Sequence, residues 1–262
     1  MSDRTLKLSI TTKVTDGDIV QLCVSGEEVP QGGVTSELPL PRLRVGTRLE
    51  EHDAAFRVIS AGWLPGSGDK ASLPLYFLKA EGEFGVGECE FSVVRAGYAL
   101  AWVTLSDKGA AGKRTDESGP LIGQLVAEKL DLAFVQGFVI PDEPLQLKGL
   151  LSDLALIQGF DLILTTGGTG VGPRDITPEA TLSVIEKRLP GYERAMTAAS
   201  LMKTPHGAIS RAVAGTLGDA VIVNMPGSPK AVAECLEPLL PTFRHTLEKL
   251  QGDPSDCALL RN

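Results

Sequence analysis

Two aspartates and a glycine-rich turn are the residues of this chain whose types and spacing could do chemistry. Asp142 and Asp175 each lie in a loop that follows an apolar run, and the glycine-rich turn comes shortly before Asp175. Two converging carboxylates suit Mg²⁺, which usually takes one or two carboxylates together with substrate phosphates and water. A pair of surface aspartates that cap helices is the alternative, and spacing alone favours neither interpretation.

The turn Gly167-Gly168-Thr169-Gly170 can expose successive backbone N–H groups to an anion, because glycine has no Cβ and lets a ligand approach closely. It lacks the Gly-Lys-Ser/Thr ending of a P-loop and the spacing of a dinucleotide-binding motif. Taken alone, the pattern is also typical of a simple tight turn. Its position after an apolar strand, with Asp175 downstream, favours a ligand site.

A second place for an anion is the turn Pro226-Gly227-Ser228-Pro229, which leads into a predicted helix. The free N–H groups and the dipole of a helix N-terminus favour negative charge there. A simple helix start, with Ser228 as the cap, is the alternative.

The elements that would position these loops alternate between strand and helix from Tyr98 onward. Strands are predicted at Ala99–Leu105, Phe134–Ile140, Asp161–Thr165 and Ala220–Val223. Amphipathic helices are predicted from Thr115 or Asp116, over Leu147–Ile157, from Thr177-Pro178, and from Ser228 to about Leu250. The alternation predicts an α/β domain over residues 98–262, with a mainly parallel sheet and helices on both faces. Ligands bind such sheets outside the carboxyl ends of the strands, where these loops begin.

Residues 1–97 have a different pattern of short apolar or alternating runs separated by Gly and Pro. These runs are Lys7–Thr12, Asp18–Val24, Phe56–Ile59, Leu73–Leu78 and Glu90–Val94. Runs of about five residues between such turns are typical of a small all-β sandwich or barrel. We therefore predict a separate all-β domain before the α/β domain.

Composition excludes several classes of protein. The 262 residues carry a formal net charge of −8 and are 43% hydrophobic and 22% charged, which is typical of a globular chain and not of a nucleic-acid-binding one. No apolar run is long enough to span a bilayer, and the N-terminus lacks the pattern of a secretory signal. We expect a cytoplasmic protein that binds neither membranes nor nucleic acid.

The cysteines show no metal-binding pattern. They stand at positions 23, 89, 235 and 257, and the histidines at 52, 206 and 245, so no CxxC or HExxH spacing exists. Free thiols, mostly buried, in a reducing compartment are the expected state.

Six segments of the second domain, in this order, resemble the molybdopterin adenylyltransferase family, the MogA/MoaB-like group of molybdenum cofactor biosynthesis that is related to the G domains of gephyrin and its plant counterpart. They are Ser106-Asp107, Asp116-Glu117-Ser118-Gly119-Pro120, Ile140-Pro141-Asp142-Glu143, Asp161–Asp175 with Thr177-Pro178, Ile209-Ser210-Arg211 and Asn224-Met225-Pro226-Gly227-Ser228-Pro229. The resemblance covers about residues 98–250. Six motifs in one order are specific, whereas none of them is specific alone.

The resemblance implies that AMP is transferred from Mg-ATP to the terminal phosphate of molybdopterin, with release of pyrophosphate. It also implies that Asp142 and Asp175 are catalytic and organise Mg²⁺ and the ATP phosphates. The residues implied to line the pocket for molybdopterin and nucleotide are Ser106, Asp107, Asp116, Ser118, Gly119, Thr166, Gly167, Gly168, Thr169, Gly170, Ser210, Asn224, Pro226 and Gly227. The implied assembly is a homotrimer, and the enzyme that inserts molybdate is an implied partner.

The sequence alone is also compatible with other functions. A carrier or scaffold would bind molybdopterin without adenylylating it, although such a protein would tolerate Asn or Ala at positions 142 and 175. A related enzyme of the same fold, either the molybdate-inserting partner or a nucleotide pyrophosphatase, is the second alternative. For residues 1–97, relation to the MOSC sulfur-carrier domains is one interpretation, but Cys23 and Cys89 stand in strand-like runs where buried structural thiols are expected, so this domain is given no chemistry.

Overall fold

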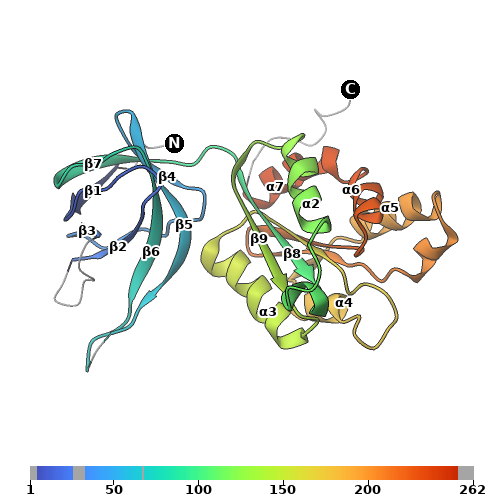
Figure 1. The fold of residues 1–262 in the computed structure, drawn as a ribbon. Helices are drawn as coiled ribbons and strands as arrows, with labels where there is room; N and C mark the ends of the chain where they lie inside the picture. The colour runs from blue at the N-terminus through green and yellow to red at the C-terminus, as the bar shows by residue number, and fades with distance from the viewer. Residues whose placement is uncertain (1–4, 26–32, 67, 253–262) are drawn as a thin grey trace. The chain divides into compact units, whose positions relative to one another are not determined.

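The computed structural model describes residues 5–25, 33–66 and 68–252 (Figure 1). By its internal contacts the chain divides into two compact units, residues 1–99 and 100–262. The prediction for the cysteine at position 257 lies outside the described residues.

The first unit is a closed β-barrel with the strand order β1-β3-β2-β6-β5-β4-β7. Its strands are β1 Thr5–Ile10, β2 Ile19–Val24, β3 Val34–Ser36, β4 Arg48–Glu51, β5 Ala54–Leu64, β6 Leu73–Glu81 and β7 Gly87–Val94. Every predicted run overlaps a strand. Strands β3 and β4 were not predicted, because three or four residues are too few to show a period.

Stacked aromatic rings form the centre of the barrel core. Phe56 and Phe84 lie with ring centroids 4.1 Å apart, and Phe91 lies 5.7 Å from Phe56. Cys23 is buried and Cys89 half-buried, and both are free thiols. Burial raises the pKa of both thiols, which makes them poor nucleophiles. The expectation of a buried thiol is confirmed for Cys23, whereas Cys89 is only half-buried.

The second unit has one six-stranded sheet with the order β11-β12-β13-β10-β8-β9. Its strands are β8 Tyr98–Leu105, β9 Leu132–Ile140, β10 Leu162–Thr166, β11 Lys187–Arg188, β12 Ala214–Leu217 and β13 Ala220–Met225. Strand β10 runs parallel to both β8 and β13, as predicted. The antiparallel strands β12 and β11 at one edge were not predicted.

Helices cover both faces of this sheet. They are α1 Asp107–Ala110, α2 Ser118–Ala127, α3 Pro144–Ser152, α4 Thr177–Leu182, α5 Pro190–Leu201, α6 Pro229–Leu236 and α7 Leu240–Leu250, with a π-helical turn at Asp153–Gln158 and a 3₁₀ turn at Pro205–Ile209. Helices α2, α6 and α7 lie on one side of the sheet, and α3 and α4 on the other (Figure 1). All residues of β10 and β13 are therefore buried, which explains their continuous apolar sequences.

The prediction of one helix from Ser228 to about Leu250 is wrong. Ser228 caps α6 as expected, because its Oγ accepts from the Ala231 N–H at 3.3 Å. The helix ends at Leu236, and a second helix begins at Leu240. Pro238 lies between them; it has no N–H to donate, and its ring would collide with the carbonyl of residue 234 in a continuous helix.

A glycine-walled slot holds Trp102 of β8. A Cβ built on Gly119 or on Gly137 would lie 2.3 Å from the indole, and one on Gly123 would lie 3.1 Å from it. Gly119 and Gly123 belong to α2 and Gly137 to β9. The absence of side chains at these three positions thus lets the indole pack between the helix and the neighbouring strand.

Residues 98–262 are expected to fold without residues 1–97. The barrel core draws its buried side chains from residues 8–91 alone, and the sheet of the second unit is complete from β8 onward. A fragment beginning at Tyr98 should unfold cooperatively and show a helical circular dichroism spectrum. A fragment beginning at Ser106 lacks β8, which pairs between β10 and β9, and is the control that should not fold. An insoluble 98–262 fragment would show that the barrel supplies part of the core.

Candidate active site

The candidate site lies where β8, β9, β10 and β13 end. The Ser106 N–H donates to the carbonyl of Ile140 at 2.9 Å, which brings the ends of β8 and β9 together. The Gly167 N–H donates to the carbonyl of Met225 at 3.1 Å, which does the same for β10 and β13. The loops that the sequence singles out therefore begin side by side, as the parallel arrangement predicts.

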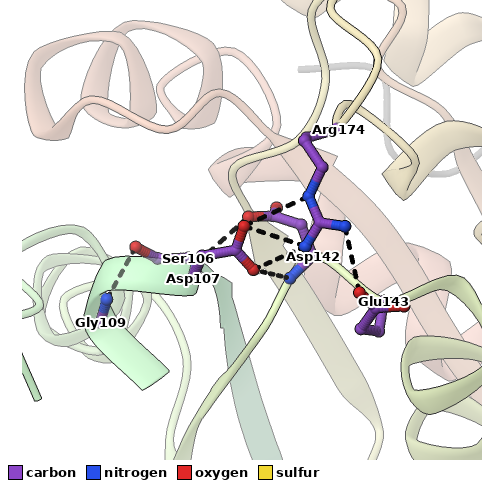
Figure 2. Close-up of polar contacts among 6 residues, drawn as sticks. All are labelled: Ser106, Asp107, Gly109, Asp142, Glu143 and Arg174. Carbon is purple, nitrogen blue, oxygen red and sulfur yellow. Dashed lines mark hydrogen bonds and ion pairs between the residues drawn. The ribbon is translucent and has the colours of Figure 1, made fainter. Parts of the chain in front are cut away.

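Asp107 and Asp142 hold the first two loops in register through reciprocal hydrogen bonds (Figure 2). The Asp107 N–H donates to Asp142 Oδ2 at 3.2 Å, and the Asp142 N–H donates to Asp107 Oδ1 at 3.1 Å. The N-cap Ser106 begins the short helix α1 by accepting from the Gly109 N–H at 3.0 Å. The carboxylate of Asp142 is thus fixed by backbone from a neighbouring strand end.

Arg174 ties the loop after β10 to the loops after β8 and β9 (Figure 2). Its Nη2 donates to both carboxylate oxygens of Asp107, at 2.8 and 2.9 Å, and its Nη1 donates to Glu143 Oε1 at 3.1 Å. This two-point guanidinium contact is geometrically specific in a way that a lysine ammonium is not. Arg174 was not among the predicted site residues, although it directly precedes Asp175.

The charges around Asp142 act in opposite directions on its pKa. Burial raises the pKa of Asp142, and the negative charges of Asp107 and Asp175 raise it further, whereas the Asp107 N–H and the charge of Arg174 lower it. The hydrogen bonds from Arg174 and from the Asp142 backbone lower the pKa of Asp107. As the pH falls, Asp142 therefore takes up a proton before Asp107 does.

Removing the Arg174 charge is expected to raise the pH below which activity is lost, that is, to shift the acid limb of the pH profile to higher pH. Arg174 lowers the pKa of Asp142, so Arg174→Ala should raise that pKa, and an activity that needs the Asp142 carboxylate should be lost at a higher pH than in the unaltered protein. Arg174→Lys keeps the charge and should shift the limb less. The measurement is the pH dependence of kcat/KM, and identical acid limbs for the three proteins would contradict the prediction.

Asp142 and Asp175 could share a divalent cation. The charge of Asp175 acts on Asp142, which is half-buried, and a cation between two such carboxylates would relieve their repulsion. No group of three or more His, Cys, Asp or Glu residues is placed to hold a metal within the described ranges. Two carboxylates with further oxygens from substrate phosphates are a usual donor set for Mg²⁺, so the residues fit that ion.

The glycine-rich loop is held in a backbone conformation that needs glycine. Gly167 and Gly168 have φ angles of +99° and +64°. A Cβ on Gly167 would lie 2.5 Å from the Leu105 carbonyl oxygen, and one on Gly168 would lie 2.4 Å from the Thr177 hydroxyl. The positive φ angles and these close approaches both require glycine at the two positions.

Thr177 anchors the same loop, which corrects the predicted role of this residue. Its hydroxyl donates to the Gly167 carbonyl at 2.9 Å, and its N–H donates to the Gly168 carbonyl at 3.1 Å. Thr177 is the first residue of α4, and the N-cap position is Ile176, which makes no side-chain cap. The Thr-Pro pair does start a helix, but the hydroxyl holds the loop instead of capping.

A small cavity of about 110 Å³ lies on one side of this loop. Six of its lining residues were predicted to bind ligand, namely Ser106, Asp116, Ser118, Thr166, Gly167 and Gly227. Asp116 is fixed by three donors, the N–H groups of Ser118 and Gly119 at 3.1 and 3.0 Å and the hydroxyl of Thr104 at 2.7 Å. Ser118 donates to the Gly227 carbonyl and Thr166 to the Pro226 carbonyl, which joins the loop after β13 to this wall.

A larger cavity of about 500 Å³ is bordered by Asp175 and Gly172. Asp175 Oδ2 accepts from the Gly172 N–H at 2.7 Å, which folds the loop back on itself. Arg211 supports this loop through two hydrogen bonds. Its Nε donates to the Gly170 carbonyl at 2.7 Å, and its Nη2 donates to the Asp175 carbonyl at 2.8 Å. The motif Ile209-Ser210-Arg211 thus contributes its arginine as a support for the loop.

Two predicted pocket residues lie elsewhere. Asn224 is fully buried within β13, where its Oδ1 accepts from the Val213 N–H and its amide donates to the hydroxyls of Thr165 and Thr181. All of its polar atoms are occupied by protein groups, so the structure gives Asn224 a supporting place beneath the loops. Ser210 lines a third cavity, of about 620 Å³, which does not include Asp175.

The remaining predicted residues lie in the loops themselves. Thr169 is buried, and its carbonyl accepts from the Arg211 N–H at 2.9 Å. A Cβ on Gly170 would lie 2.7 Å from Asp175 Oδ2, so this glycine allows the carboxylate to pack against the backbone. Pro226 contributes its carbonyl to Thr166 at 2.7 Å.

The second unit is a doubly wound α/β fold, with a parallel centre to its sheet and helices on both faces. Its glycine-rich loop and the two aspartates lie at the carboxyl ends of the strands, which is where proteins of this class usually bind ligands. Residues 101–245 match the family described as "probable molybdopterin binding domain". This chain belongs to that family.

Individual relatives cover the same part of the chain. A molybdopterin adenylyltransferase of Helicobacter pylori is 37% identical over 153 residues, which are 58% of this chain and 86% of that protein. The molybdenum cofactor synthesis protein cinnamon of Drosophila melanogaster is 37% identical over 153 residues, but the match spans only 26% of its length. The crystal structure of the molybdopterin biosynthesis enzyme MoaB from Thermus thermophilus is 41% identical, covers 61% of this chain and 99% of that one, and has a TM-score of 0.55. In the described ranges no helix is long and apolar enough to cross a membrane.

Proposed function

We propose that this protein is a molybdopterin adenylyltransferase. An oxygen of the terminal phosphate of molybdopterin attacks the α-phosphorus of ATP, and the bond from that phosphorus to the oxygen bridging the α- and β-phosphates breaks. Pyrophosphate leaves with the electron pair, and the product is molybdopterin joined to AMP through a phosphoanhydride. ATP and molybdopterin are the substrates, and Mg²⁺ is the expected metal.

The observation that carries the proposal is the meeting of Asp142 and Asp175 beside a glycine loop, where the charge of one raises the pKa of the other. Attack of one phosphate on another brings anions together, so catalysis depends on positioning, backbone N–H donors and charge neutralisation. The relatives named as molybdopterin adenylyltransferases match this part of the chain over most of their length. The reaction needs no Ser or Cys nucleophile.

Different residues of this chain would hold the metal, position its ligands and bind the pterin. The carboxylates of Asp142 and Asp175 would hold Mg²⁺, which when bound would neutralise phosphate charge. Asp107 and Arg174 keep Asp142 in place. The small cavity, walled by Asp116, offers a carboxylate and backbone groups to a polar heterocycle, and we place the pterin there.

The assembly and surroundings of the enzyme are part of the same proposal. We infer a homotrimer in the cytoplasm that passes its product to the enzyme that inserts molybdate, with residues 1–97 as an all-β domain of separate role. The support is the family to which residues 101–245 belong. Sedimentation of the full chain tests the trimer, and a monomer would contradict it.

The test of the activity is pyrophosphate release from Mg-ATP with and without molybdopterin, followed by analysis of the product for an AMP-linked pterin. Release that requires molybdopterin is the expected result. Binding of molybdopterin without release would contradict the proposal and favour the carrier or scaffold function. Release that does not require molybdopterin would favour a nucleotide pyrophosphatase.

A further inference from the structure

One further cation, Lys148, lines the larger cavity. Lys148 lies in α3, is half-buried, and lines the cavity of about 500 Å³ together with Asp175 and Arg211. It lies outside the motifs of the sequence, within an amphipathic helix where a lysine is ordinarily a solvated residue.

The two arginines near Asp175 have their charges occupied by protein groups. Arg174 is bound to the carboxylates of Asp107 and Glu143. Arg211 is paired with Glu179 and donates to two loop carbonyls. Lys148, in contrast, has no ion pair or hydrogen bond of its ammonium group with any residue in the described part of the chain. It is the cation in this cavity that remains available to a ligand.

We propose that Lys148 binds the phosphate chain of the nucleotide in the larger cavity. The inference rests on the proposed adenylyl transfer and adds to it the place of one substrate. In this arrangement the β- and γ-phosphates lie between the Lys148 ammonium and the Asp175 side of the cavity, and the α-phosphate faces Asp142. Lys148 then stabilises the charge that collects on pyrophosphate as the bond to the α-phosphorus breaks.

The volume of the larger cavity and the chemistry of its lining favour ATP over molybdopterin as the molecule whose phosphates Lys148 binds. A chain of three phosphates needs room, and the two cavities beside the glycine loop differ in volume, about 500 Å³ against about 110 Å³. Asp175, which would hold Mg²⁺ for the polyphosphate, borders the larger one. An ammonium group with three donors is a common partner for phosphate oxygens as a point charge. The terminal phosphate of molybdopterin carries the same chemistry, so the experiment must separate the two sources.

The experiment titrates the full-length protein with Mg-ATP and with inorganic pyrophosphate in a calorimeter, without molybdopterin, and measures KM for both substrates. Lys148→Ala is expected to weaken binding of both ligands by about tenfold or more, as the loss of a charged hydrogen bond does, and to raise the KM for ATP with little change in that for molybdopterin. Lys148→Arg should retain most of the affinity. Lys129→Ala is the matched control, because Lys129 is exposed and lines neither cavity.

Several results would overturn the inference. They are unchanged affinities in Lys148→Ala, an increase confined to the KM for molybdopterin, an equal loss in Lys129→Ala, or an unaltered protein that binds neither Mg-ATP nor pyrophosphate. Failure of the proposed function looks different: Lys148-dependent binding persists, but molybdopterin elicits no pyrophosphate release. A circular dichroism spectrum of Lys148→Ala that matches the unaltered protein excludes misfolding as the cause of lost binding.

Discussion

Replacing Asp142 or Asp175 with asparagine is expected to lower kcat by about a hundredfold or more, because each change removes a negative charge where a cation and phosphate oxygens must be held. Asparagine is isosteric with aspartate, and its side-chain oxygen can still accept the hydrogen bonds that Asp142 takes from Asp107 and Asp175 takes from Gly172. The loops should therefore keep their positions. Molybdopterin binding should change little.

The measurement is molybdopterin-dependent pyrophosphate release over a range of Mg²⁺ concentrations. Asp131→Asn is the control, because Asp131 is an exposed carboxylate paired with Arg244 and borders neither cavity. Normal rates in both Asp142→Asn and Asp175→Asn would show that the carboxylate assignment is wrong. Loss in Asp131→Asn as well would indicate a general effect of charge.

The largest expected effect on stability is that of Gly167→Ala. The residue has a φ of +99°, and its Cβ would lie 2.5 Å from a backbone oxygen of Leu105 that cannot move without breaking the end of β8. Left-handed strain alone costs about 1–3 kcal/mol, and the collision adds to it. We expect a loss of more than about 2 kcal/mol in the free energy of unfolding, with loss of ligand binding.

Gly112→Ala separates strain from collision. Gly112 also has a positive φ, of +68°, but a Cβ there would meet nothing within 4 Å. It should lose about 1 kcal/mol, from backbone strain alone. Urea unfolding followed by the helical circular dichroism signal makes the comparison, since the α-helices of the described chain all lie in the second unit. Equal stability of the two variants would contradict the close approach at Gly167.

The strands and the loops that follow them were predictable because their signals are local. The apolar runs of β10 and β13 show burial on both faces, and the rule for parallel sheets then places their loops together. Asp142 and Asp175 could be expected at one edge on this ground. The break before α7 was also readable, since Pro238 is in the sequence, but the apolar period on both sides concealed it.

What could not be predicted depends on contacts between residues far apart in the chain. Arg174 binds Asp107, which is 67 residues away, and no local pattern marks that pair. Asn224 was assigned to the pocket because it begins a loop motif, yet it still belongs to β13, where the alternation of a strand turns its side chain toward Thr165 and Thr181. The role proposed for Lys148 depends on its place in the larger cavity, which the sequence does not show.

The packing around Trp102 makes the substitutions that are tolerated at positions 102, 123 and 137 depend on one another. An alanine at Gly137 would overlap the indole, and one at Gly123 would press against it, so these two glycines tolerate a side chain only after Trp102 has become smaller. An alanine at Gly119 would overlap both the indole and the Asp116 carboxylate, so this position stays closed to a side chain even then. A smaller residue at 102 would in turn leave a void under α2 until a glycine is replaced. Permissible substitutions here must come in pairs, in an order that passes through one poorly packed intermediate.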